Sequence, residues 1–157
     1  MKVSTGVAWG VITGFIIGVP TAILSYLFMV AATDWLKEQI YRHAVAMGRD
    51  PEAARQIAEL AVASAIATAP IGAFLFTIAL YLVIGIIMAL LWKHVRPWYV
   101  LGLLFGVILF AIDVVPDLLS PMPTEVSSLA YMSPLLNFVG PFLLAWFLNR
   151  RALRPEA

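Results

Sequence analysis

The sequence predicts an all-α integral membrane protein, with four transmembrane helices in a bundle and an extracytoplasmic amphipathic helical hairpin between helices 1 and 2. Three observations lead to this class. Apolar residues make up 62% of the 157 residues and charged residues only 12%, whereas a soluble domain carries about 25% charged residues. The apolar residues gather in four long stretches. A long polar segment separates the first two of these stretches.

Each apolar stretch has about the length that a membrane span needs. The stretches cover approximately residues 7–32, 69–92, 98–115 and 129–148. A helix that crosses a hydrocarbon core of ~30 Å needs roughly 20 residues. The first stretch is longer than this, and Pro20 inside it predicts a kink. We therefore treat residues 1–157 as a single transmembrane domain.

The placement of lysine and arginine predicts how the spans are oriented. With the N-terminus in the cytoplasm, the cations on that side crowd the span ends: Lys2, Lys93, Arg96, Arg150, Arg151 and Arg154. The cations on the other side are spread over a long loop: Lys37, Arg42, Arg49 and Arg55. Because cations near span ends weigh most in topology, we expect a multi-pass protein of the cell membrane with both termini cytoplasmic.

The loop at residues 33–68 has the pattern of two helices outside the membrane. Gly48 ends the first helix, and Asp50 caps the second, which has Pro51 at its first position. The first helix carries Leu36, Ile40, Ala44 and Met47 on one face, and the second has a small-residue face of Ile57, Leu60, Ala61 and Ser64. Such a hairpin either covers its own bundle or binds a partner or the membrane surface.

Glycines recur at every fourth position of the first span: Gly6, Gly10, Gly14 and Gly18. Residues four apart lie on one helix face, so these glycines form a smooth groove that allows close helix contact in lipid. Gly102 and Gly106 repeat the spacing in the third span. Two interpretations follow. The first and third spans pack together within one chain, or the groove binds a second copy and gives a homo-oligomer.

Four polar side chains near the ends of the third and fourth spans form a candidate polar pathway: Asp113, Asp117, Ser133 and Asn137. The helical rise places Asp113 and Ser133 at the same depth. We therefore expect the Asp113 carboxylate to bond Ser133 or Tyr131, with Asn137 one turn deeper. Acids within spans are functional candidates, so the cluster is either the outer entrance for a cation or polar solute or an interfacial acid that caps a helix.

Prolines divide the same region. Pro116 is expected to break the third helix, which would keep Asp113 and Asp117 from sharing a face as metal ligands. Pro134 and Pro141 each remove one intrahelical hydrogen bond around Asn137 and free a carbonyl.

Several function classes are disfavoured. The chain has no cysteine, which excludes disulfides and thiolate metal sites. Serine-hydrolase, zinc-protease, P-loop and dinucleotide motifs are absent, and no basic surface suits a nucleic acid. We predict no cofactor and no metal. The sequence favours a non-catalytic subunit or scaffold of a membrane assembly, or a homo-oligomer. A small oligomeric channel or transporter is the alternative, and an enzyme acting on lipids has the least support.

Overall fold

The computed structural model describes residues 1–95, 97–119, 129 and 132–152, and the side chains of all of these except 116–119. The helices in this part are α1 (Val3–Ala31), α2 (Thr33–Ala46), α3 (Pro51–Leu91), α4 (Trp98–Leu119) and α6 (Met132–Ala152). All of them except α2 are long and apolar enough to cross a membrane, which gives four spans. The prediction of an all-helical, multi-pass protein of a lipid bilayer is confirmed.

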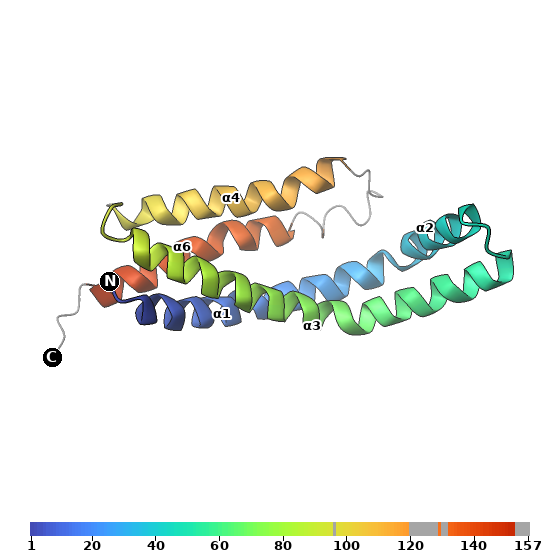
Figure 1. The fold of residues 1–157 in the computed structure, drawn as a ribbon, viewed down its shortest axis with the longest axis horizontal. Helices are drawn as coiled ribbons and strands as arrows, with labels where there is room; N and C mark the ends of the chain where they lie inside the picture. Colours follow the sequence, from blue (N-terminus) through green and yellow to red (C-terminus); the bar gives the residue numbers. More distant parts are fainter. Residues whose placement is uncertain (96, 120–128, 130–131, 153–157) are drawn as a thin grey trace.

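The spans form two antiparallel pairs. Figure 1 shows α1 beside α3 along most of their lengths, with α4 and α6 as the second pair. Helix α6 joins the pairs, because it packs against α1 as well as against α4. The N-terminus and the last turn of α6 lie at one end of the bundle, which we name the terminus end (Figure 1). Helix α2 and the turn into α3 lie at the other, the hairpin end.

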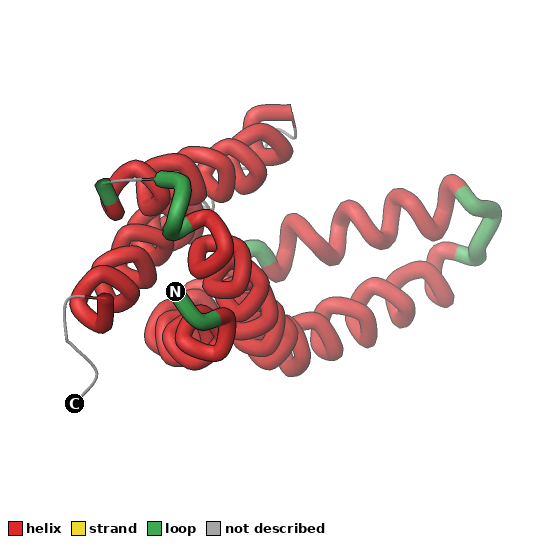
Figure 2. The backbone as a smooth tube through the Cα atoms, turned by 60° about the vertical axis from the view of Figure 1, so that its left-hand side comes forward, coloured by secondary structure: helices red, strands yellow, loops and turns green. Residues whose placement is uncertain are grey.

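The turn between α2 and α3 has the caps that the sequence predicts. Gly48 adopts a φ of 82°, a left-handed conformation that glycine accepts without strain. The Asp50 carboxylate accepts hydrogen bonds from the backbone N–H groups of Glu52, at 3.1 Å, and Ala53, at 3.5 Å. Pro51 occupies the first helical position. Helix α2 therefore folds back along the first turns of α3, as both views of the backbone show (Figures 1 and 2).

Two details of this region differ from the prediction. Helix α3 runs for 41 residues from Pro51 to Leu91, so no boundary separates the second hairpin helix from the second span. The small-residue face of that helix does not cover the bundle, which was one of its two predicted roles, because all four of its residues are exposed, Leu60 by 72%. The buried residues at these turns are Ala54, Ala58 and Val62. These smaller side chains let α2 approach closely, which the larger Leu60 would prevent.

The predicted break at Pro116 is wrong as well, because α4 continues through it to Leu119. A proline removes one intrahelical hydrogen bond, and membrane helices tolerate that loss. The helical backbone places positions 113 and 117 one turn apart, so Pro116 does not separate them.

The glycine face of α1 is covered by α3, the second span. A Cβ atom added at Gly10 would lie 2.5 Å from the carbonyl oxygen of Tyr81, and one at Gly14 would lie 2.7 Å from the Cα of Ile78. Gly6 lies against the Gly85 carbonyl in the same way. The helix backbones are therefore in direct contact, at a separation that only glycine allows.

The glycines of α4 pack against α6, the other helix of the second pair. A Cβ at Gly102 would lie 3.1 Å from the Cα of Phe142, and one at Gly106 would lie 2.7 Å from the Phe138 carbonyl oxygen. The expectation that the first and third spans pack on each other is therefore wrong. Each span uses its small residues against a neighbour in sequence, because a short connection or hairpin already brings the two together.

Candidate functional site

A hydrogen bond between Asp113 and Asn137 joins α4 to α6. The Asn137 amide nitrogen donates to a carboxylate oxygen of Asp113 at 2.6 Å, in a partly buried position. This pairing differs from the predicted one with Ser133 or Tyr131. Side chains on a helix point toward its N-terminus, so Asp113 points deeper into the bundle and Asn137 points toward the hairpin end. The two meet between the depths of their Cα atoms.

The hydroxyl of Tyr81 lies in the middle of the bundle with no hydrogen-bond partner in the described structure. Tyr81 is fully buried on α3, and its hydroxyl lies against Gly140 of α6, where a Cβ atom would collide with it. Gly140 therefore provides the space for the end of the ring.

Two further polar groups lie inside the bundle. The Thr13 hydroxyl, on the glycine face of α1, is fully buried and also has no partner among the described residues. Pro141 has no N–H, so the backbone carbonyl of Asn137 lacks its hydrogen bond within α6. Each span therefore contributes one polar side chain: Thr13, Tyr81, Asp113 and Asn137.

The polar groups lie deep in the protein rather than at its surface. Tyr81 is about 16 Å of helix from Trp92, and Asn137 is about 18 Å from Asn149, at 1.5 Å per residue. Both distances are about half of a ~30 Å hydrocarbon core. Polar groups at this depth are costly unless they are paired, and here only the Asp113–Asn137 pair is bonded. We name Thr13, Tyr81, Asp113 and Asn137 the central polar cluster.

The other predicted site residues fall outside this cluster. Ser133 is half-buried near the start of α6 and forms no hydrogen bond with Asp113. The side chain of Asp117 and the whole of Tyr131 lie outside the described residues. Within the described ranges, no three His, Asp or Glu side chains are grouped as metal ligands.

Thr13, Tyr81 and Gly140 have no place in the predicted site, although the sequence holds a signal for two of them. Thr13 stands between Gly10 and Gly14, and Tyr81 stands four residues before Gly85. A residue beside a close-packed glycine is covered by the neighbouring helix, which accounts for the burial of both residues between α1 and α3. The Tyr81 hydroxyl itself is enclosed by Gly140 of α6.

No protein-family model, curated protein or solved structure matches this chain. The contacts above therefore carry the functional proposal.

Replacing Tyr81 with phenylalanine is expected to leave the stability unchanged or to raise the free energy of unfolding by about 1 kcal/mol. A buried hydroxyl without a partner costs about 1–3 kcal/mol of desolvation, and the substitution removes it while keeping the ring. Unfolding in mixed micelles with increasing denaturing detergent measures the change. Tyr99→Phe is the control, because Tyr99 is exposed. A clear loss of stability in Tyr81→Phe would instead mean that the hydroxyl has a bound partner.

Proposed function

We propose that this chain is a non-catalytic membrane subunit that self-associates through the outward face of α3. One observation carries the proposal. All ten glycines lie in the described residues, and Gly72 is the one helical glycine with no atom within 4 Å of its Cβ position. Glycine costs about 1 kcal/mol relative to alanine in a helix. Elsewhere in the spans, a neighbouring helix that packs on the glycine offsets that cost.

Gly72 belongs to a row of small residues on the exposed side of α3. Ser64, Thr68 and Gly72 are spaced by four and are all exposed. The Thr68 hydroxyl donates a hydrogen bond to the Ser64 carbonyl at 2.8 Å, so this hydroxyl is already paired within α3. Small residues at this spacing allow close backbone contact between helices, the contact that drives association where the row enters lipid at Gly72. A two-fold axis can place the same face on both copies, and we name it the α3 face.

The α3 face replaces the glycine face of α1 as the proposed contact. Gly6, Gly10 and Gly14 pack against α3 of the same chain. A second copy could bind them only after the α1–α3 pair had separated. The opposite side of α3 is open in the monomer, so assembly through it requires no rearrangement.

Cysteine cross-linking in native membranes tests the proposal, because the chain has no cysteine of its own. We expect Thr68→Cys to form an oxidised species at twice the chain mass of 17.2 kDa. Ile23→Cys is the matched control, because Ile23 is exposed on α1 and the antiparallel register, in which Gly18 lies against Phe74, places it near the depth of Thr68. Equal cross-linking of both variants would indicate random collision. Cross-linking of Thr68→Cys only to a foreign protein would contradict self-association.

The central polar cluster supports a second candidate function, a small oligomeric channel or transporter. The observation that favours it is the pair of unpartnered hydroxyls, Thr13 and Tyr81, in the same bundle as the Asp113–Asn137 bond. A cation or small polar solute could exchange its hydration for these oxygens. Under this alternative, Asp113 supplies the negative charge that attracts a cation.

The orientation and the hairpin belong to the same proposal. The cations at the terminus end support a cytoplasmic location for both termini in the cell membrane. The hairpin of α2 and the first turns of α3 would then lie outside the membrane. The solvated side of α2 is charged, as the exposed ion pair between Arg42 and Glu38 at 2.7 Å illustrates. A charged solvated side suits an amphipathic element at a membrane surface.

A further inference from the structure

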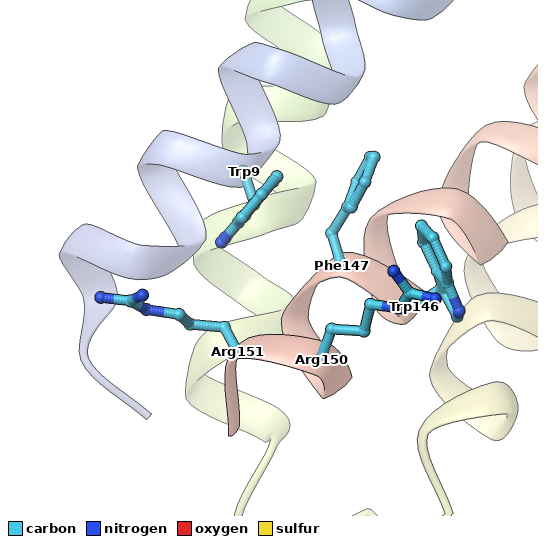
Figure 3. A pocket seen from close by; sticks show the side chains of 5 residues that line it. All are labelled: Trp9, Trp146, Phe147, Arg150 and Arg151. Atoms are coloured by element: carbon cyan, nitrogen blue, oxygen red, sulfur yellow. The ribbon is translucent and has the colours of Figure 1, made fainter. Parts of the chain in front are cut away.

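A cavity of about 190 Å³ opens between α1 and α6 at the terminus end of the bundle. Its lining residues are Trp9, Trp146, Phe147, Arg150 and Arg151 (Figure 3). The arginines are the last cations of α6, where the span leaves the hydrocarbon core. We name this cavity the arginine pocket.

The aromatic residues give the arginine pocket a fixed apolar wall. Trp9 stacks on Phe147 with 4.7 Å between ring centroids and 17° between planes, which ties α1 to α6. The guanidinium carbon of Arg150 lies 4.0 Å from the centroid of the Trp146 ring. Figure 3 shows Arg151 extending toward α1 and Arg150 toward Trp146, on opposite sides of Phe147. The two cations therefore flank an apolar surface.

Both guanidinium groups keep their hydrogen-bond donors available. No carboxylate lines the pocket, and within the part of the chain that the structure describes, neither arginine forms an ion pair. Each guanidinium carries five N–H donors in a planar fork that matches phosphate oxygens. The stacking of Arg150 on Trp146 holds one fork in place without using its donors.

We propose that the arginine pocket binds the phosphate headgroup of an anionic phospholipid. Basic pockets between spans suit such headgroups, and tryptophans at a span end lie at headgroup depth. Cations on opposite sides of the aromatic wall suit a headgroup with more than one anionic group. A free phosphate would use the same donors but would have no use for the apolar wall.

A second cavity of about 380 Å³ is lined by apolar side chains of the same two helices, among them Pro20, Leu24, Leu136 and Val139. Leu136 and Val139 lie about 15–20 Å of helix from Asn149. This cavity therefore begins near the bilayer centre, where an acyl chain anchored at the arginine pocket would end.

Native mass spectrometry of the full chain in mild detergent tests the proposal by counting retained lipids. The probes are a phospholipid with two phosphates (cardiolipin), one with a single phosphate and net charge (phosphatidylglycerol), zwitterionic phosphatidylcholine and inorganic phosphate. We expect preferential retention of the anionic lipids. Arg150→Gln and Arg151→Gln should each lower that retention by about fivefold, and the double variant by about twentyfold.

Lys93→Gln is the matched control, because it removes an exposed cation at the terminus end of the bundle but outside the pocket. It should leave lipid retention unchanged. An equal loss in Lys93→Gln would overturn the proposal in favour of diffuse surface charge. Displacement of the lipid by millimolar inorganic phosphate would overturn the choice of a lipid as ligand. Both arginines are exposed, so the single variants give the same answer should the double variant fail to fold.

Discussion

Replacing Gly10 with leucine is expected to lower the free energy of unfolding by about 3 kcal/mol or more, the upper range for overpacking. The added Cβ atom would lie 2.5 Å from the Tyr81 carbonyl oxygen and 3.0 Å from the Cα of Leu82. Both are backbone atoms of α3, so no side-chain rotation relieves the collision and the helices must separate. Detergent unfolding followed by tryptophan fluorescence measures the loss.

Gly72→Leu is the matched control for this experiment. It introduces the same side chain into a span, but the Cβ position of Gly72 is open. The variant should therefore fold as the wild type does, even if it loses self-association through the α3 face. Wild-type stability in Gly10→Leu would show that α1 does not pack on α3 through its glycine face.

Removing either partner of the Asp113–Asn137 bond is the second change with a large expected effect. Asp113→Ala and Asn137→Ala should each cost about 1–3 kcal/mol, because the remaining polar group stays partly buried without its partner. The double variant should cost less than the sum of the two, with a coupling energy of about 1 kcal/mol, in the range for polar pairs in membrane proteins. Additive costs would mean that the two side chains do not interact.

The same position separates the two candidate functions. Asp113→Asn keeps the size of the side chain and removes its charge. If the chain conducts a cation, its flux into liposomes should fall in this variant while the protein stays folded. A flux that is absent in the wild type, or unchanged in Asp113→Asn, counts against the channel or transporter and leaves the non-catalytic subunit.

The sequence predicts the spans because each is a simple consequence of hydropathy and length. The turn at Gly48 and Asp50 is predicted for a similar reason, since its geometry depends on residues that are adjacent in the chain. The continuity of α3 is missed. A fall in polarity after Glu59 indicates where lipid begins, but it does not indicate where a helix ends.

The candidate site is predicted only in part, because spacing defines a helix face and not its partner. The repeat from Gly6 onward indicates close packing, yet the same repeat fits α3, α4 or a second copy. The partner of Asp113 is missed because the rise per residue gives the depth of Cα atoms, whereas side chains lean along the helix. The contact of Tyr81 with Gly140 joins distant parts of the chain and leaves no local pattern.

The mass of the assembly extracted from its own membrane tests self-association through the α3 face most directly. Native mass spectrometry in mild detergent should compare the wild type with Gly72→Leu. We predict a wild-type species at a multiple of the 17.2 kDa chain mass and a shift of Gly72→Leu toward the single chain. A wild type that is a single chain, or that is bound only to foreign subunits, would contradict the proposal.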